Sequence, residues 1–258
     1  MLIAVDIGNT NTVFGFFKGE ELLLQARVKT DIKRTEDEFF AFLMPILSQN
    51  DLLMCNINDA VISCVVPCAL ASVQRFFTTY CKINSIVVNY KKHNVNVAGI
   101  IAPHLGSDLA VNAIAAAQLF KSDCLIIDFG TATTFSLLEY SKLNYIGVAI
   151  APGRNSILQS MRNSAAQLPL LNFQKSDKIL GITTIEAMHA GSYFAFIGMI
   201  EKIIDRMKEE YKPDFKVIAT GGLSGSIKGA IMEIDFIEPN LTLLGLKYFY
   251  SMVVTCSN

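Results

Sequence analysis

The sequence predicts an α/β protein made of two similar halves, each with a mixed β-sheet flanked by helices. An apolar run, an aspartate, a glycine and then hydroxyl- or amide-bearing residues occur in this order at 2–12, and the same order returns at 124–134. The two aspartates lie about half of the 258-residue chain apart. Strand-like and helix-like segments follow each copy in a comparable order. We therefore expect halves at 1–118 and 119–258, with the ligand-binding cleft between them.

Composition excludes several classes of protein. Hydrophobic residues make up 52% of the chain and charged residues 17%, which indicates a sizeable core and hints at a subunit interface. The net charge of −1 argues against broad binding to nucleic acid, which needs a basic face. We expect no signal peptide and no transmembrane helix, because no basic leader and no run of 18 apolar residues occur. Six cysteines without a C-x-x-C pair are typical of reduced thiols in a cytoplasmic protein.

The first half is expected to begin with three strands joined by tight turns, and to continue with helices alternating with buried strands. The strands are expected at 2–6, 11–17, 21–29, 60–66 and 86–89. Thr35 and Glu38 have the spacing of a capping box, so a helix begins there and runs through Ile46, with Pro45 expected to kink or shorten it. Further helices are expected at 69–80 and 108–120.

The second half is expected to repeat this order. Its strands are expected at 124–128, 132–139, 143–149 and 216–220. Its helices are expected at 154–165, at 183–209, from Leu223 to near Met232, and at 241–254. The 183–209 helix carries spaced apolar residues that we expect to build a two-fold interface, namely Ile185, Met188, Phe194, Ile197, Ile200 and Ile204.

The two Asp-x-Gly turns are suited to holding a phosphate. Backbone amides and hydroxyls can bind the phosphate while the carboxylate faces a metal ion. One Asp-x-Gly turn that leads into threonine is a weak signal, because aspartate at a strand end and glycine in a turn are common. Two copies, each after an apolar strand and each opening a hairpin, strengthen it. Residues 128–130 also spell the Asp-Phe-Gly of protein kinases, but no H-R-D loop and no Walker loop accompany them.

Two further motifs each have a structural and a functional interpretation. In Gly106-Ser107-Asp108, at a helix start, the carboxylate either complements the helix dipole or acts as a general base in the cleft. The sequence 219–223, ATGGL, is either a simple strand-to-helix turn or a place where glycine lets the backbone approach a flat ring. Sequence alone leaves both choices open.

The chain resembles the type III pantothenate kinases, members of the superfamily of acetate and sugar kinases, heat-shock ATPases and actin. The resemblance extends over nearly the whole chain, through DIGNTNT at 6–12, SCVVP at 63–67, GSD at 106–108, DFGTATT at 128–134, APG at 151–153, GITTIEAMHAG at 181–191, ATGGL at 219–223 and LTLLGL at 241–246. It implies a duplicated ribonuclease H-like, actin-like ATPase fold.

The resemblance also implies a function. The family phosphorylates pantothenate with ATP in the first step of coenzyme A synthesis, as dimers that need Mg²⁺ or another divalent cation and K⁺ or NH₄⁺. It implies that the nucleotide is held by Asp6, Ile7, Gly8, Asn9, Thr10, Asn11, Thr12, Val13, Thr131, Gly221 and Gly222. Asp128 would bind the monovalent cation, Asp6 would face the divalent ion through phosphate, and Asp108 would be the catalytic base. Pantothenate would contact Gly106, Ser107, Asp108, Leu109 and Thr184.

The acceptor side departs from the family pattern. Leu109 stands where the family has an arginine, and the loop at 99–103 lacks the family's tyrosine and asparagine. An arginine at 109 would bind the pantothenate carboxylate as a fork, which leucine cannot do. Arg154 and Arg162 are candidate substitutes, against the alternative that both lie on a solvated helix face. The alternative function is a nucleotide-binding relative with an altered acceptor or a regulatory, weakly active role.

Overall fold

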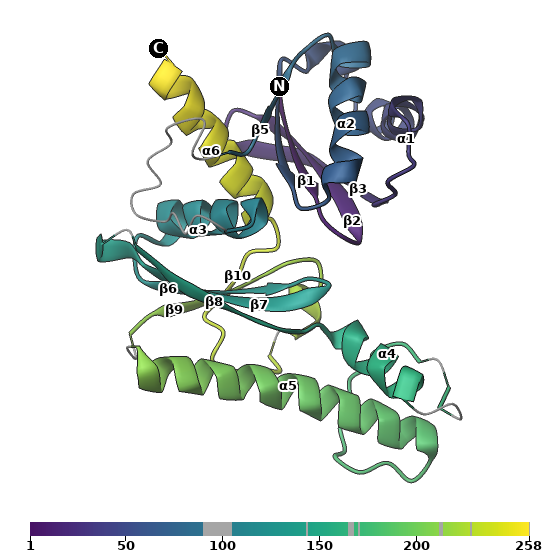
Figure 1. The fold of residues 1–258 in the computed structure, drawn as a ribbon, viewed down its shortest axis with the longest axis vertical. Coiled ribbons are helices and arrows are strands. Elements are labelled where there is room, and N and C mark those ends of the chain that lie inside the picture. The colour runs from purple at the N-terminus through teal and green to yellow at the C-terminus, as the bar shows by residue number, and fades with distance from the viewer. Residues whose placement is uncertain are drawn as a thin grey trace. The chain divides into compact units, whose positions relative to one another are not determined.

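The computed structural model describes residues 1–89, 105–142, 144–164, 168–169, 171–211, 214–227 and 229–257. The chain forms two compact units (Figure 1). Unit 1 contains the described residues of 1–119, together with Lys142, Asn144 and 240–257, and unit 2 contains those of 120–141 and 145–239. The C-terminal segment therefore packs with the first unit, whereas the sequence was divided at 118. The loop at 99–103 lies outside the described residues.

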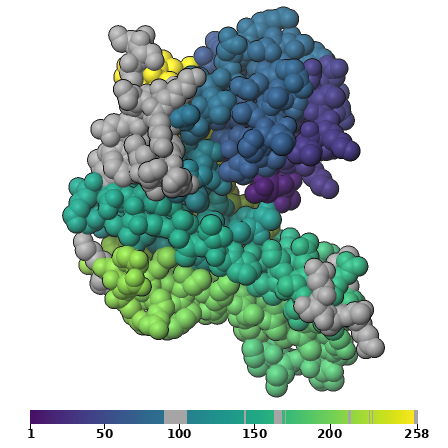
Figure 2. All heavy atoms as spheres, in the orientation of Figure 1, coloured from purple at the N-terminus to yellow at the C-terminus, as the bar shows by residue number. Residues whose placement is uncertain are grey.

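Unit 1 is built on a five-stranded sheet whose strand order is β3-β2-β1-β4-β5. The strands are β1 (Leu2–Ile7), β2 (Asn11–Lys18), β3 (Glu21–Lys29), β4 (Asp59–Cys64) and β5 (Ser85–Val87). β1 pairs antiparallel with β2 and parallel with β4. Both faces of β1 are covered, since Ile3, Ala4 and Val5 are fully buried. This explains why β1 reads as an uninterrupted apolar run up to Asp6. In Figure 2 the atoms of residues 1–89 form one continuous body.

Helices α1 (Glu36–Gln49) and α2 (Pro67–Phe76) belong to the first unit. The predicted capping box is confirmed: the Glu38 N–H donates to Thr35 Oγ1, and the Thr35 N–H donates to Glu38 Oε2. The expectation that Pro45 shortens α1 was wrong, because the helix continues to Gln49, and a kink at Pro45 stays a prediction. Pro45 faces solvent, where water can satisfy the carbonyl that it leaves without an N–H. After α2, a π-helical turn (Phe77–Cys81) ends at Lys82.

The last helix, α6 (Leu241–Ser257), crosses α3 (Ser107–Phe120) within unit 1. The contact is so close at Gly245 that a Cβ there would stand 1.9 Å from the Val111 carbonyl oxygen. Beside it, Thr242 Oγ1 donates to Oδ1 of the buried Asn112 at 2.8 Å. Only a residue without a side chain lets the two backbones meet at this distance.

Unit 2 repeats the sheet of unit 1. Its strands are β6 (Cys124–Phe129), β7 (Ala132–Glu139), β8 (Asn144–Pro152), β9 (Lys216–Thr220) and β10 (Phe236–Ile237). Their order, read from the edge at β8, is β8-β7-β6-β9-β10, with β6 antiparallel to β7 and parallel to β9. β1 and β6 thus occupy the same central place in their sheets, as the duplicated aspartate turns predict.

Helices α4 (Arg154–Ser164) and α5 (Thr184–Glu210) belong to unit 2, and Figure 1 shows α5 running along one face of its sheet. The proposed interface stripe on α5 was wrong in large part, because its apolar residues mostly fill the core of unit 2. The buried ones are Met188, Ile197, Ile200 and Ile204. The helix expected from Leu223 to Met232 was also wrong: a 3₁₀ turn (Ser224–Ile227) stands there, and Gly229 has φ +76°. The two-residue β10 was missed.

Candidate functional site

The turn after β1 is held by Thr30, the residue that follows β3. Its hydroxyl donates to the Gly8 carbonyl at 2.7 Å, and its backbone N–H donates to the Thr10 carbonyl at 2.9 Å. The same hydroxyl lies 3.0 Å from Oγ1 of the buried Thr12. A further bond, from Gly8 N–H to Asn11 carbonyl at 3.0 Å, closes the turn. The backbone shape of this turn is therefore fixed by four internal contacts.

The residues predicted to hold ATP along this turn differ in exposure. The side chains of Ile7 and Thr12 are buried in unit 1, so these two residues have only backbone groups to offer a ligand. Asn9 and Thr10 stand exposed at the tip, and Gly8, Asn11 and Val13 are half-buried. A phosphate would thus meet backbone amides and two exposed side chains, as in other turns that bind anions.

A line of polar side chains joins Asp6 to the start of α3. Asp6 at the end of β1 pairs in parallel register with Ser63 of β4, so their side chains lie on the same face of the sheet. Ser63 is fully buried, and its Oγ lies 2.9 Å from Ser107 Oγ. Ser107 Oγ also accepts the Cys64 N–H at 3.0 Å. Ser107, predicted to contact substrate, is therefore the residue that ties α3 to β4.

Asp108 follows Ser107 directly in the chain. Its Oδ1 accepts the Leu109 N–H at 2.8 Å, and Gly106 accepts the Ala110 N–H through its carbonyl at 3.0 Å. Burial raises the pKa of Asp108 above its ordinary value, and backbone hydrogen bonds only partly oppose this. A half-buried carboxylate with a raised pKa is a better proton acceptor than an exposed one. This environment suits a general base, although Asp108 also begins a helix.

In unit 2, Asp128 at the end of β6 lies between two threonines. It pairs with Thr134 of β7 on one side and with Thr220 of β9 on the other, which puts all three side chains on one face. Thr220 is fully buried, and the hydroxyls of both threonines lack a hydrogen-bond partner among the described residues. Buried hydroxyls are costly without a partner, so this group is suited to an added ligand.

Gly221 covers Asp128 from the end of β9. Its φ is +89°, and a Cβ there would stand 2.4 Å from Asp128 Oδ1 and 2.8 Å from the Phe129 carbonyl. Its own carbonyl accepts the N–H and the hydroxyl of Ser224, at 3.1 and 2.8 Å. Gly222 follows on the exposed side of this turn. Glycine at 221 is thus required by a close approach between backbone and carboxylate.

The turn after β6 carries Thr131, exposed at its tip. The Gly130 N–H donates to the Ala132 carbonyl at 3.1 Å and closes the turn. From the other side, the Ser156 hydroxyl donates to the Thr131 carbonyl at 3.3 Å. The structure therefore brings Asp128, Thr131 and the Gly221–Gly222 turn together in one unit.

Thr184 lies apart from these groups in sequence and begins α5. It is exposed, and the residue before it, Thr183, caps the helix with Glu186 in a capping box. The N–H groups of Thr183 and Ile182 both donate to Glu186 and hold the pKa of its carboxyl below the ordinary value. Thr184 therefore stands beside a well-ordered helix start, and its contact with pantothenate stays a prediction.

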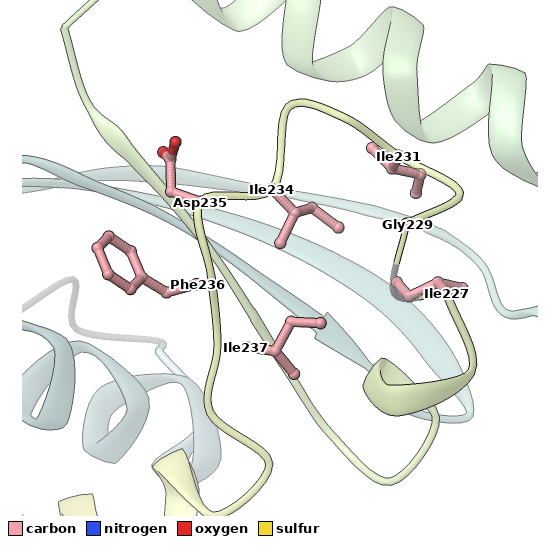
Figure 3. Close-up of a pocket in the computed structure, with 7 residues that line it drawn as sticks. All are labelled: Ile227, Gly229, Ile231, Ile234, Asp235, Phe236 and Ile237. Carbon is pink, nitrogen blue, oxygen red and sulfur yellow. The ribbon is translucent and has the colours of Figure 1, made fainter.

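A separate cavity of about 310 Å³ lies in unit 2 (Figure 3). It is lined by Ile227, Gly229, Ile231, Ile234, Asp235, Phe236 and Ile237. Asp235 Oδ2 accepts the Val217 N–H at 2.8 Å, which joins the cavity wall to β9. None of the predicted site residues lines it. Among the described residues, no group of three acidic, histidine or cysteine side chains could hold a metal, and no helix has the length and apolar character of a membrane span.

Sequence reasoning missed three residues of these arrangements. Ser63, Thr134 and Thr220 were read as strand residues, although each lies beside one of the two aspartates. The usable signal was a hydroxyl within or at the end of an apolar strand that neighbours an Asp-ending strand. Finding it requires the strand register, because the partners are far apart in sequence.

Comparison with known proteins agrees with this architecture. A sequence profile of the family described as type III pantothenate kinase matches residues 2–206. A type III pantothenate kinase of Geobacillus sp. (strain WCH70) is 38% identical over 251 residues, covering 97% of each chain. That of Bacillus cytotoxicus is 37% identical and covers 97% of this chain and 95% of its own.

Solved structures share the fold at lower identity. A putative Baf family transcriptional activator from Campylobacter jejuni matches with a TM-score of 0.59 at 18% identity, over 99% of both chains. The activator of 2-hydroxyisocaproyl-CoA dehydratase from Clostridium difficile, solved with ADPNP, matches with a TM-score of 0.53 at 14% identity, over 99% of this chain and 95% of its own. These two matches show the fold, and the profile together with the two sequence relatives shows that the chain belongs to the type III pantothenate kinase family.

Proposed function

We propose that this protein transfers a phosphoryl group from ATP to the primary hydroxyl of pantothenate, giving 4'-phosphopantothenate in the first step of coenzyme A biosynthesis. One observation supports it above all: the line of polar side chains from Asp6 through Ser63 and Ser107 to Asp108. It joins the phosphate-binding turn to a carboxylate with a raised pKa inside one unit. The enzyme works in the cytoplasm, in line with its family.

Asp108 is the residue that accepts the proton of the acceptor hydroxyl. Phosphoryl transfer needs positioning and charge stabilisation more than covalent chemistry, so the base acts late and its orientation matters. The Leu109 N–H fixes one carboxylate oxygen at 2.8 Å, which limits the orientation of the carboxyl group. Ser107 keeps the start of α3 attached to β4, and through it keeps Asp108 in place.

The donor sets fit two kinds of cation. A divalent ion such as Mg²⁺, bound with the ATP phosphates and facing Asp6, would supply charge neutralisation during transfer. For a monovalent ion, K⁺ or NH₄⁺, the carboxylate of Asp128 and the hydroxyls of Thr134 and Thr220 offer oxygens on one face of the sheet. The two buried hydroxyls without a described partner are the observation that supports this assignment.

A second candidate function has one specific observation in its favour. Leu109 is half-buried next to the base, where the family arginine would offer its fork to the pantothenate carboxylate. A nucleotide-binding relative with another acceptor, or with a regulatory and weakly active role, would explain this residue. We prefer the kinase because both phosphate turns and the base are kept.

A coupled assay that follows ADP release with ATP, Mg²⁺, K⁺ and pantothenate tests the proposal. We expect turnover with a high KM for pantothenate, because losing one charge-assisted contact costs about 1.5–3 kcal/mol, or roughly ten- to a hundredfold in affinity. Leu109→Arg is expected to lower that KM and leave the KM for ATP unchanged. No product from either protein, with ATP still bound, would favour the second candidate.

The protein acts as a homodimer in this proposal. The support is a run of exposed apolar side chains just before and at the start of α5: Ile179 is 63% exposed, Leu180 80%, Ile182 97% and Ile185 49%. Exposed apolar side chains grouped in this way are typical of a surface that another chain covers. Light scattering at micromolar concentration decides the point, since a fully active monomer would contradict it.

A further inference from the structure

The start of α4 is pressed against the turn after β6. A Cβ on Gly153 would stand 2.2 Å from the Thr131 carbonyl oxygen and 3.0 Å from that of Gly130. Ser156, in the first turn of α4, donates its hydroxyl to the same Thr131 carbonyl at 3.3 Å. Gly153 therefore touches the turn, and Arg154, the first residue of the helix, follows it directly in the chain.

Arg154 is supported by an aromatic column inside unit 2. Its Cζ lies 5.6 Å from the centroid of the Phe173 ring, within the range of a cation–π contact. Phe173 packs edge-on against Phe196 of α5 at 5.5 Å, and Phe196 packs against Phe129 at 6.2 Å. Phe129 is the residue before Gly130, so the column begins and ends at the same turn. These contacts restrict where the guanidinium can lie.

The guanidinium is also partly withdrawn from water. Burial lowers the pKa of Arg154, which nevertheless stays protonated at any pH at which the protein is folded. A partly desolvated cation binds an anion more strongly than an exposed one. Arg162 on the same helix is exposed and supplies a natural comparison.

We propose that Arg154 binds an oxyanion of the reactants at the Gly130–Thr131 turn. The inference rests on the proposed function, because the oxyanion is either a phosphate of the nucleotide or the carboxylate of the acceptor. Arginine suits both, since its planar fork matches phosphate and carboxylate oxygens. Its position beside Thr131 and its aromatic support distinguish it from an ordinary surface arginine.

Calorimetric titration of the full-length protein tests the inference without requiring turnover. AMP-PNP with Mg²⁺ is titrated first, and pantothenate is then titrated into the AMP-PNP complex. The variants are Arg154→Ala, Arg154→Lys and, as the matched control, Arg162→Ala. Phe173→Leu is a fourth variant, which keeps the arginine and removes the aromatic face. Thermal melting of each variant confirms that it is folded.

We expect Arg154→Ala to weaken one of the two ligands roughly ten- to a hundredfold, the range for a lost charge-assisted contact. Arg154→Lys recovers only part of this loss because it lacks the fork, Phe173→Leu loses less than Arg154→Ala, and Arg162→Ala matches wild type. A weaker AMP-PNP titration identifies the nucleotide phosphate as the partner. An unchanged AMP-PNP affinity with a weaker pantothenate affinity identifies the carboxylate as the partner. In steady-state kinetics we expect the KM of the same ligand, ATP or pantothenate, to rise.

The inference is overturned if Arg154→Ala and Arg162→Ala bind both ligands alike. Failure of the proposed function gives a different pattern: the wild-type protein then binds AMP-PNP but neither binds nor phosphorylates pantothenate. In that case the AMP-PNP titration of Arg154→Ala decides alone, and an unchanged affinity rejects the role of Arg154.

Discussion

The turns after β1 and after β6 have the same place in their sheets but differ in how their polar groups are satisfied. Beside Asp6, Ser63 bonds to Ser107, and Thr30 holds the turn through Gly8 and Thr10. Beside Asp128, the hydroxyls of Thr134 and Thr220 lack a partner among the described residues. For these hydroxyls the first turn is thus complete by itself, whereas the two hydroxyls beside Asp128 gain hydrogen bonds or ligation only when something binds.

This difference indicates that the two copies of the duplicated turn have different roles. The complete turn needs no ligand to keep its shape, so it can present amides and a nearby base in a fixed geometry. The second turn carries the cost of buried hydroxyls without partners, which a ligand can remove. We therefore expect ligands to change the stability of the second turn more than that of the first.

The largest expected effect concerns the base beside the complete turn. Asp108→Asn is expected to lower kcat by about 10²–10⁴-fold, the usual contribution of a general base. Burial raises the pKa of Asp108, so the folded state disfavours the charged carboxylate. The protein is therefore more stable with Asp108 neutral, and it loses this stability as the pH rises through the folded-state pKa. The variant lacks this loss, so its Tm is expected to exceed that of wild type at neutral pH.

The pH dependence supplies the control for this prediction. The gap in Tm is expected to close as the pH falls below about 3.9, the ordinary aspartate pKa, where Asp108 is neutral in both states. The acidic limb of kcat/KM in wild type is expected to lie above that same value. An Asp108→Asn variant that melts lower than wild type at pH 7 would contradict the account of burial.

The next effect compares the two glycines at the turns. Gly221→Ala places a Cβ 2.4 Å from Asp128 Oδ1 at φ +89°, whereas Gly8→Ala places one 3.2 Å from the Asn11 carbonyl. We expect roughly 2–5 kcal/mol of destabilisation at Gly221, from backbone strain and overpacking together. At Gly8 we expect less than about 1 kcal/mol. Urea titrations followed by circular dichroism measure both, and equal losses would show that the turns are built alike.

The smallest effect concerns the threonines beside Asp128. In wild type, K⁺ at ten times its Kd is expected to add about 1.4 kcal/mol, a rise in Tm of roughly 3–5 °C. Thr220→Val and Thr134→Val are expected to lose this rise, and to melt at or above wild type in choline chloride because a costly buried hydroxyl is gone.

Ser63→Ala is the matched control in the other unit. Its hydroxyl is already bonded to Ser107, so we expect it to melt lower than wild type in both salts and to keep the K⁺-dependent rise. If the Tm of Thr220→Val still rises with K⁺ at equal ionic strength, the cation does not contact this hydroxyl. The unsatisfied hydroxyls would then not distinguish the second turn from the first.

Much of the fold follows from local sequence signals, and the exceptions have physical causes. The Thr35–Glu38 capping box and the strands at both hairpins depend on neighbours within a few residues, and they were predicted correctly. The segment after Leu223 was not, because Gly229 adopts a positive φ that no apolar spacing reveals. Pro45 was misjudged because its exposure on α1, which decides the cost of a proline, depends on tertiary packing.

The candidate site was predictable only as far as its motifs. The glycines and aspartates follow from turn chemistry, whereas the pairing of Asp128 with Thr134 and Thr220 depends on register between strands up to about ninety residues apart. Whether a hydroxyl is satisfied depends in turn on every neighbour in that register. The aromatic support of Arg154 was equally hidden from sequence reasoning, since Phe173 follows it by nineteen positions and packs against Phe196 of α5.

The meeting of Gly245 with the Val111 carbonyl has a consequence for biosynthesis. α6 packs against β1 and β4 and crosses α3. β1 is therefore synthesised long before the helix that covers it. While the chain emerges from the ribosome, that face of β1 and β4 stays uncovered until translation has passed Leu241. Unit 1 is therefore completed only after unit 2 has been synthesised, and until then this apolar face is exposed to aggregation.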